Sequence, residues 1–502
     1  MAVKGNASLS RDLARYVPAK VVPALLGFLV IVLLSRRLPA AAYGSYAALL
    51  AVARLADSLG FAWLRQSILR FRPEAASSGE EAEFKRLLSL LLLVIVGVEA
   101  ALVFLCSVAL QHGVVRAALA AGMVISMTPY TFAATIVQAE RAAGTYAGGA
   151  LIQSVVQTAW VGLFVFLAHR GEAWALLGVL AGLAAGTAYL VGASRGAVWS
   201  RPLPLARVDL GRVKVLCGYG LPVALSVLGF QLVNQGNRLL LFALGSAESA
   251  GVFASAYDLI NGSLSLLMTP FLLAAHPAIM EARLRAGGAA RRGVEEILSS
   301  VSRHLLMIFL PVLFLATVLR GYVFAPLGPG YGVEGWVVPV LVTGAFVGQF
   351  AMYAHKGLEI ADRTTTILRI TAATGLLNLG LNALLIPHYS YFAVAIVSLL
   401  THTAYFAVAS MLSRRHAALR IPWPPVRRFA AAVAFSGLVF PAARAAVAAT
   451  GAPAEAALLV GTLAFGSTYL AVLAWWGELP ASLLARPGAV PRVPAREGGV
   501  GR

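Results

Sequence analysis

Cysteines and charged residues are scarce in this chain, and both shortages exclude classes of protein. Only 2 of its 502 residues are cysteine and only 12% are charged, whereas an average soluble domain is about 25% charged. The two cysteines, Cys106 and Cys217, lie in or beside apolar segments and indicate neither a disulfide framework nor a metal site. Hydrophobic residues make up 59% of the sequence, more than a water-soluble core can account for. The composition therefore indicates a membrane protein.

Motifs for catalysis and nucleotide binding are also missing. No glycine-rich loop ending in Lys-Ser or Lys-Thr is present, so we do not expect the chain to hydrolyse ATP. Neither metal-spaced Cys or His pairs nor a serine nucleophile elbow occurs. The net charge of +19 comes from basic residues spread through short connections, without the aromatic-basic platform typical of nucleic-acid binding. We therefore expect no enzyme, no resident cofactor and no nucleic-acid partner, and we expect the basic connections to contact anionic membrane lipids.

Long apolar segments recur along the whole chain. About fourteen segments of roughly 20 residues, the length needed to cross a hydrocarbon core of about 30 Å, alternate with short polar connections. Because a helix satisfies every backbone amide within its own segment, the pattern predicts an all-α polytopic membrane protein. The predicted spans are 16–35, 41–63, 87–110, 116–138, 147–168, 173–193, 216–241, 250–274, 304–324, 336–356, 367–386, 391–412, 427–447 and 455–476.

Basic residues fall in alternate connections, which predicts an orientation. Most of the 40 Lys and Arg residues lie in the two tails and in one set of connections, and short basic segments of this kind stay in the cytoplasm. We therefore expect a multi-pass protein with both termini in the cytoplasm, and we assign Lys356 and Arg363 to the inner rim. The predicted outer connections are short, which excludes a folded outer domain. The outer side, counting these connections and the adjoining ends of the spans, keeps Arg36, Arg37, Arg116, Arg170, Arg320 and Arg444.

Short motifs recur in the same order in the two halves of the chain. Gly44-Ser45-Tyr46-Ala47 in the first half matches Gly251-Val252-Phe253-Ala254 in the second, and Glu140-Arg141 matches Asp362-Arg363. The order predicts two six-helix pseudo-repeat lobes, 1–205 and 206–424, related by an axis along the membrane normal; chance matching is the alternative. Two appended helices would follow at 425–478. The Pro, Gly and Arg-rich segment 479–502 predicts a disordered cytoplasmic tail.

Several of these motifs also resemble those of a known family. They are Tyr43-Gly44-Ser45-Tyr46 after Leu34-Ser35-Arg36-Arg37-Leu38, then Tyr219-Gly220-Leu221-Pro222 with Asn237-Arg238, then Gly328-Pro329-Gly330-Tyr331, and finally Asn378-Leu379-Gly380-Leu381-Asn382. Over about residues 10–412, their order and spacing resemble the polysaccharide (oligosaccharide-lipid, O-antigen type) flippases of the multidrug/oligosaccharidyl-lipid/polysaccharide exporter superfamily. That family often has Asp where this chain has Asn237, which argues against a proton role at this position.

The resemblance implies a function and a set of partners. It implies translocation of a polyprenyl-pyrophosphate-linked oligosaccharide to the outer face of the bacterial inner membrane, for O-antigen, capsule or exopolysaccharide synthesis. Alternating access of two lobes would move the substrate, with a proton or sodium gradient as the candidate driving force. Polysaccharide polymerase and chain-length proteins are candidate partners. The alternatives are a peptidoglycan-precursor flippase, a multidrug or metabolite antiporter of the same superfamily, and, from another class, a membrane glycan polymerase or ligase.

Three basic residues within the predicted spans are assigned to neither side of the membrane: Lys20, Arg54 and Arg238. A charged side chain at this depth must face protein or water, so these residues are candidates for binding pyrophosphate in a cationic cavity. Lys20 could instead extend to the inner headgroups. Arg54 and Asp57 are three residues apart and can pair on one helix face. Either Arg54 binds pyrophosphate while Asp57 exchanges a coupling ion, or the two neutralise each other.

Other polar residues complete the candidate site. Asp258 is the second ion-coupling candidate, with a neutral, hydrogen-bonded carboxyl as the alternative, and we expect Glu99 to be neutral because burial disfavours the charged form. The candidates for a polar cavity are amides, for which hydrogen bonding between helices is the alternative role. They are Asn234, Gln235, Asn237 and Asn261.

Overall fold

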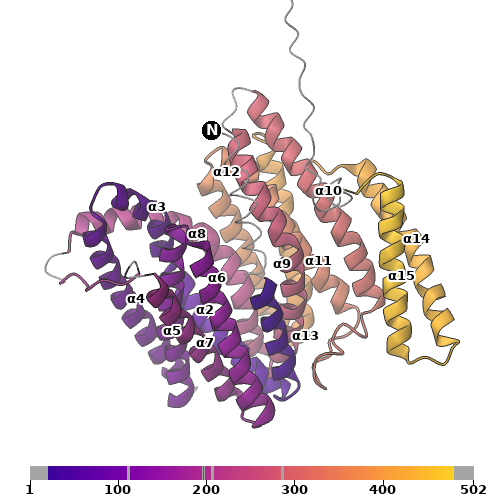
Figure 1. The fold of residues 1–502 in the computed structure, drawn as a ribbon, viewed down its shortest axis with the longest axis horizontal. Helices are drawn as coiled ribbons and strands as arrows, with labels where there is room; N and C mark the ends of the chain where they lie inside the picture. The colour runs from indigo at the N-terminus through magenta and orange to yellow at the C-terminus, as the bar shows by residue number, and fades with distance from the viewer. Residues whose placement is uncertain are drawn as a thin grey trace, which may run out of the picture. The chain divides into compact units, whose positions relative to one another are not determined.

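The computed structural model describes residues 21–109, 113–194, 196, 198–204, 208–283 and 288–479. Within these residues the chain is helical, without a β-strand (Figure 1). A helix at Val21–Ser35 comes first. It is followed in the first half by α2 (Ala40–Gly60), α3 (Ala62–Ser77), α4 (Glu81–Ala109), α5 (Val114–Ala139), α6 (Ala143–Trp160) with the π-helical segment η1 (Val161–Leu167), and α7 (Glu172–Ala193).

The second half begins with α8, a long helix capped by Asp209, whose side chain accepts a hydrogen bond from the backbone N–H of Gly211. The helices of this half are α8 (Leu210–Leu240) with η3 (Leu241–Gly245), α9 (Ala247–Arg283), α10 (Gly288–Val318), α11 (Val337–Ala354), α12 (Lys356–Ile360), α13 (Thr364–Ser413), α14 (Trp423–Ala448) and α15 (Ala454–Trp475).

These helices confirm the predicted fold class of an all-α polytopic membrane protein. Among the described residues, nine helices are long and apolar enough to cross a membrane. Helix α13 covers two predicted spans, and it breaks at Ser390, where φ is +51°. Each predicted span overlaps a helix, although residues 16–20 of the first span lie outside the described residues.

Helix α3 corrects one expectation, since residues 64–86 were predicted to be a connecting loop. The chain bends by 47° after α2 and continues as a helix. Phe61, Leu64 and Ile68 recur at helical spacing and are fully buried, so α3 has one apolar face directed into the core. Its Ser67 hydroxyl donates to the carbonyl of Leu216 on α8 at 2.8 Å. The charged residues of this segment interrupt its apolar pattern, so the sequence did not predict this amphipathic helix, which connects the two halves of the chain through its contact with α8.

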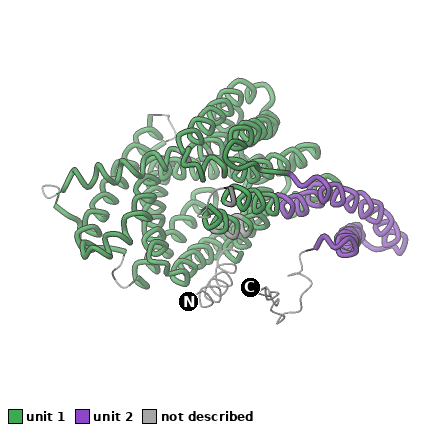
Figure 2. Tube along the Cα trace, turned by 90° about the horizontal axis from the view of Figure 1, so that it is seen from above, with its two compact units in different colours: residues 1–301, 316–420 green, residues 302–315, 421–502 purple. Residues whose placement is uncertain are grey.

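The described chain divides into two compact units (Figure 2). Unit 1 comprises Met1–Val301 and Ala316–Arg420, and unit 2 comprises Ser302–Leu315 and Ile421–Arg502. The predicted first lobe, 1–205, and most of the second, 206–424, fall within unit 1, whereas residues 302–315 and 421–424 belong to unit 2. The boundary between the two lobes near residue 205 stays a prediction. The predicted disordered tail, apart from residue 479, lies outside the described residues.

Unit 2 is held together by aromatic packing and a buried carboxylate. Phe314 of α10 stacks on Phe465 of α15 with ring centroids 4.7 Å apart. Glu478, only 5% exposed, accepts hydrogen bonds at 2.6 Å from both Arg303 and Arg428. A carboxylate paired with two guanidinium groups fixes the end of α15 against α10 and α14.

Two glycines from matching sequence motifs meet where α2 crosses α9 in unit 1. A Cβ atom on Gly44 would lie 1.9 Å from the carbonyl oxygen of Ala247, and a Cβ on Gly251 would lie 1.8 Å from that of Ala40. The contact is reciprocal, as expected if the two motifs belong to a repeat. Only glycine permits so close an approach of the two backbones.

The segment before α11 contacts the chain just before α2. The Tyr331 hydroxyl donates to the carbonyl of Leu38 at 2.8 Å, and Nε of Arg36 donates to the carbonyl of Pro326 at 2.8 Å. Burial raises the pKa of Tyr331, so its hydroxyl keeps its proton and acts as a donor. Together with the glycine crossing, these bonds close the predicted outer end of unit 1.

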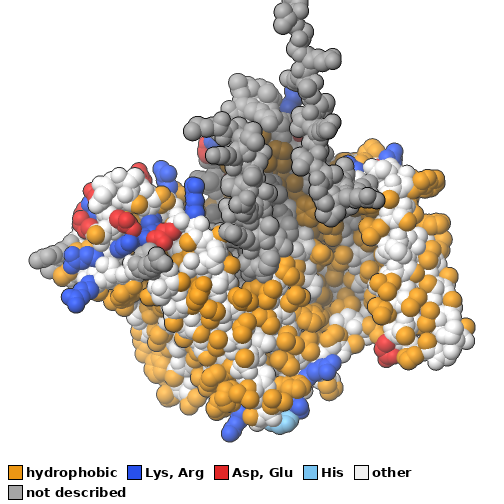
Figure 3. All heavy atoms as spheres, viewed as in Figure 1, with side chains coloured by type: hydrophobic (Ala, Val, Ile, Leu, Met, Phe, Trp, Pro, Cys, Tyr) orange, Lys and Arg blue, Asp and Glu red, His pale blue; other side chains and the backbone are white. Residues whose placement is uncertain are grey.

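The exposed surface is apolar over much of its area. Figure 3 shows hydrophobic side chains over much of the middle and lower part of the visible face, with most Lys, Arg, Asp and Glu side chains near α3 and a few along the opposite edge. Large apolar side chains such as Leu105 and Leu384 are 62% and 69% exposed. So continuous an apolar surface is unusual for a protein in water and suits contact with lipid.

Candidate functional site

An ion pair with a buried guanidinium group joins α8 to α9 within unit 1. Arg238 is only 4% exposed, and it donates through Nη1 to Oδ2 of Asp258 at 3.1 Å and through Nη2 to Oδ1. Its guanidinium also lies over the ring of Tyr257, 5.8 Å from the centroid, where the cation is attracted to the π face. Because both carboxylate oxygens are engaged, this geometry disfavours the predicted role of Asp258 in ion coupling.

Arg54 of α2 is directed toward the same pair. It interacts electrostatically with Arg238, Asp258 and Tyr46, yet none of the described residues forms an ion pair or a hydrogen bond with its half-buried side chain. The predicted pairing of Arg54 with Asp57 is therefore not what the structure shows. Two guanidinium groups therefore act on one carboxylate, that of Asp258, although only Arg238 is bonded to it, which leaves the cluster with a net positive charge.

Asp57 is directed toward α4 and α5 and interacts electrostatically with Glu99. Both carboxyl groups are 6% exposed, and one oxygen of each, Oδ1 of Asp57 and Oε1 of Glu99, is buried without a hydrogen-bond partner. Thr128 donates to the other oxygen of Glu99 at 2.9 Å. Gly60 makes room for the pair, because a Cβ there would lie 1.9 Å from Oε1 of Glu99. Arg65 also interacts electrostatically with Asp57, so one positive charge acts on two buried carboxyl groups, and a further cation or a proton would balance them.

The predicted cavity amide Asn237 belongs instead to a closed network between α8 and α13. Asn237 donates to the Ser398 hydroxyl at 3.1 Å and accepts from Asn382 at 2.9 Å. Asn382 also contacts Asn378, which donates to Thr401 at 2.9 Å. These side chains are buried and mostly bonded to one another, so they serve helix packing.

The other candidates differ in their surroundings. Asn234 and Asn261 line a cavity of about 500 Å³ in the second half of the chain. Gln235 is 7% exposed, and its side-chain carbonyl has no hydrogen-bond partner. Lys20 lies outside the described residues. The remaining residues that line the cavity are Tyr257, Ala345, Gly348, Gln349, Met352, His355, Lys356, Glu359, Thr364, Ile367 and His402.

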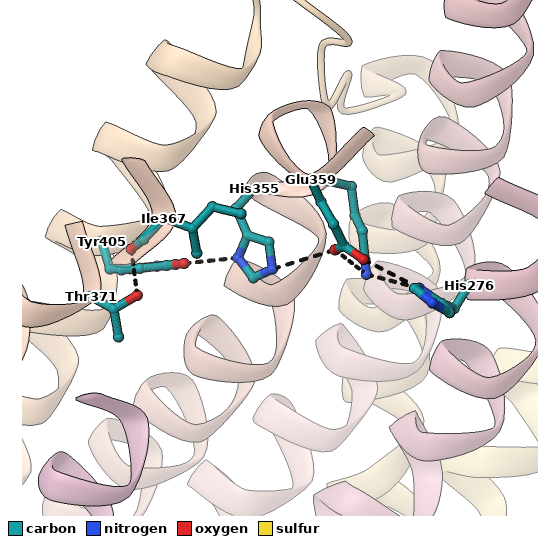
Figure 4. Close-up of polar contacts among 7 residues, drawn as sticks. His276, His355, Glu359, Ile367, Thr371 and Tyr405 are labelled. Carbon is teal, nitrogen blue, oxygen red and sulfur yellow. Dashed lines mark hydrogen bonds and ion pairs between the residues drawn. The ribbon is translucent and has the colours of Figure 1, made fainter. Parts of the chain in front are cut away.

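A charged cluster at one end of this cavity was not predicted. Figure 4 shows Glu359 between His355 and His276. The ammonium group of Lys356, which is 4% exposed, donates to Glu359 at 2.6 Å and contacts Nδ1 of His276 at 3.1 Å. Nδ1 of His355 is 2.8 Å from the hydroxyl of Tyr405. The charge pattern of the sequence assigns Lys356 to the inner rim. The signal that could have predicted this cluster is the position of Lys356 at the end of an apolar span, three residues before Glu359.

Charged pairs and amides buried within an apolar helical bundle are features of a membrane transporter. The model of the polysaccharide biosynthesis protein family matches residues 10–283 of this sequence, more than half of the chain. The chain therefore belongs to that family, and the predicted resemblance to the polysaccharide flippases is confirmed.

Solved structures show the same fold. The structure titled "Lipid II flippase MurJ, inward closed conformation" matches with a TM-score of 0.68 at 10% identity, covering 93% of this chain and 99% of that one. An inward-facing MATE-family multidrug resistance transporter of the MOP superfamily has a TM-score of 0.61 at 15% identity, with coverage of 80% and 97%. An outward-facing one has a TM-score of 0.52 at 15% identity, with coverage of 80% and 95%. No curated protein matches the sequence.

Proposed function

We propose that this protein is a flippase that moves a polyprenyl-pyrophosphate-linked oligosaccharide from the cytoplasmic to the outer face of the bacterial inner membrane. Surface polysaccharide synthesis would use the product. The observation that carries the proposal is Arg54, a cation without a pairing partner among the described residues, next to the Arg238–Asp258 pair. Arginine is well suited to binding phosphate, and a pyrophosphate would balance the excess positive charge of the cluster. The same charge disfavours a multidrug antiporter for cationic drugs.

Alternating access is the proposed mechanism, with both termini in the cytoplasm. The glycine crossing of α2 and α9 and the contacts of Tyr331 hold the predicted outer end closed. A substrate would therefore enter from the cytoplasmic side, while its polyprenyl chain stays in lipid. Rocking of the two lobes would then expose the cavity to the other face. Polysaccharide polymerase and chain-length proteins are the partners we expect to receive the product.

Coupling to a proton or sodium gradient is assigned to Asp57 rather than Asp258. Asp258 is held by both nitrogens of the Arg238 fork. Asp57 instead interacts with Glu99, and each has a buried oxygen without a partner. A bound cation or proton would stabilise this pair, and its release would be unfavourable in one of the two conformations.

The test uses the purified protein in liposomes that contain a labelled undecaprenyl-pyrophosphate-linked oligosaccharide. We expect the wild type to translocate it and Arg54→Gln to lower the rate at least tenfold, because a charged hydrogen bond of about 1.5–3 kcal/mol is lost. Arg116→Gln is the matched control, since Arg116 is exposed and paired with Glu172. Wild-type translocation by Arg54→Gln would refute the assigned role.

A peptidoglycan-precursor flippase is the second candidate. The observation that favours it is the likeness to the lipid II flippase, whose structure is covered to 99% by this chain. The same liposomes loaded with lipid II distinguish the two. Faster transport of lipid II than of the oligosaccharide lipid would favour the second candidate.

A further inference from the structure

The cavity lined by Lys356 and Glu359 has the chemistry of a binding site that is separate from the Arg54 cluster. Its volume of about 500 Å³ lies in the usual range of ligand pockets. The cavity starts next to the cluster, because Asn234 lies one helical turn before Arg238 and Tyr257 directly precedes Asp258. Side chains four residues apart on a helix lie about 5–6 Å from each other. A ligand held at Arg54 could therefore reach into the cavity with its next chemical group.

The cavity is electrically balanced. The one Lys in its lining, Lys356, donates to its one carboxylate, Glu359, at 2.6 Å. Two histidines face this pair: His276 of α9, whose Nδ1 lies 3.1 Å from the Lys356 ammonium, and His355, whose Nε2 lies 3.9 Å from Glu359. The Nδ1 of His276 accepts from the ammonium, and the Nδ1 of the buried His355 lies 2.8 Å from the hydroxyl of Tyr405, which can donate to it, so we take both histidines as neutral. Because the Glu359 side chain is more exposed than that of Lys356, at 26% against 5%, an anionic group in this cavity would meet the carboxylate first and be repelled, which favours an uncharged ligand.

The lining offers both donors and acceptors that the protein does not use. Nδ1 of His402 lies 3.1 Å from the carbonyl of Gly344 and so carries its proton, which leaves Nε2 as an acceptor. Gln349 donates to Ser265 at 3.1 Å, which leaves its carbonyl. Asn234 accepts from Tyr257 at 3.0 Å, which leaves its amide hydrogens. Within the described residues, Asn261 has no hydrogen bond through its side chain.

Unused donors and acceptors in a cavity without net charge suit hydroxyl groups, each of which both donates and accepts. We propose that this cavity is the subsite for a neutral sugar unit of the glycan, next to the pyrophosphate. Asn261, Gln349 and His402 bind its hydroxyls, and the Lys356–Glu359 pair excludes acidic sugars. This inference rests on the proposed flippase function and names the part of the substrate that the second half of the chain selects.

The experiment measures binding of three lipids to the full-length protein in detergent micelles. They are undecaprenyl pyrophosphate, the same lipid carrying N-acetylglucosamine, and the same lipid carrying glucuronic acid. We expect the wild type to bind the N-acetylglucosamine lipid at least tenfold more tightly than the bare lipid. Asn261→Ala and Gln349→Ala should bring this ratio close to one while leaving binding of the bare lipid unchanged. Gln153→Ala is the matched control, because Gln153 pairs with Gln157 on α6, outside the cavity.

A gain of binding provides a second readout that a misfolded variant could not give. Glu359→Gln removes the carboxylate and leaves the charge of Lys356 unbalanced, so binding of the glucuronic acid lipid should strengthen about tenfold. Equal binding of the bare and N-acetylglucosamine lipids by the wild type would overturn the subsite while leaving the flippase proposal intact. Failure to bind any of the three lipids would overturn both. A fall in the ratio for Gln153→Ala as large as for Asn261→Ala would also overturn the assignment.

Discussion

Replacing Gly44 with alanine should open the predicted outer end of the protein. The new Cβ would lie 1.9 Å from the carbonyl oxygen of Ala247, whereas ordinary contacts begin at 3.4 Å. The helices α2 and α9 would have to separate locally by roughly 1.5 Å, and overpacking of this kind costs about 1–3 kcal/mol. If the crossing exists only in the outward-closed conformation, the whole cost falls on that state. Its population relative to the open state should then drop by roughly 5- to 150-fold.

Thiol labelling of intact cells measures this shift. Ser255 lies one turn beyond Gly251 on α9 and is fully buried, so Ser255→Cys in a background without Cys106 and Cys217 reports access from outside. We expect a membrane-impermeant reagent to label this cysteine slowly when residue 44 is glycine. In the Gly44→Ala background the labelling rate should rise by the same factor of roughly 5 to 150 as the population of the open state. Gly97→Ala on α4 is the control, because no atom lies within 4 Å of its new Cβ. Equal labelling rates in the two alanine variants would refute the role of the crossing.

Three further predictions concern buried polar groups. Asn382→Ala removes a donor to Asn237 and Asn378 and should lower the free energy of unfolding by about 1–3 kcal/mol, measured by chemical denaturation in detergent; an unchanged midpoint would contradict it. Glu478→Ala removes the carboxylate that Arg303 and Arg428 share in unit 2 and should cost about 1–3 kcal/mol, because both guanidinium groups stay partly exposed to solvent; the loss should be seen as faster proteolysis between α14 and α15. Glu99→Gln should abolish the acceleration of transport by an ion gradient and leave transport without a gradient unchanged. Glu172→Gln is the control. If transport by Glu99→Gln still depends on the gradient, the Asp57–Glu99 pair is not the coupling site.

The spans were predictable because their signal is local. A window of about 20 apolar residues has no stable alternative to a membrane helix, and every predicted span overlaps a helix. Boundaries were less predictable where helices continue past the apolar window. Helix α8 starts at Leu210 rather than 216, because Asp209 caps it. Helix α3 was missed because its buried residues, such as Leu64 and Ile68, are separated by charged ones.

The candidate site was predictable only where a single residue stands out. Arg54 and Arg238 are charges inside apolar segments, which a sequence displays directly. The partner of a charged side chain is set by tertiary packing. The three-residue spacing predicted that Asp57 pairs with Arg54 on one helix, whereas the structure places Asp57 near Glu99 on another helix. Lys356 contacts His276, 80 residues away, and no local pattern connects the two. The sequence therefore predicted which charged side chains belong to the candidate site, but not which side chains they interact with.

The two halves of the chain within unit 1 differ in chemistry, and this difference assigns each half a separate role in the proposed function. Gly44 and Gly251 occupy matching positions and meet reciprocally, which supports the repeat. Behind this crossing the first half holds two buried carboxyl groups, Asp57 and Glu99, with unpartnered oxygens. The second half holds Asn237 within a largely satisfied amide network and a neutral, hydroxyl-binding cavity. Ion coupling is therefore expected in the first half and sugar selection in the second, with Arg54 and Arg238 between them.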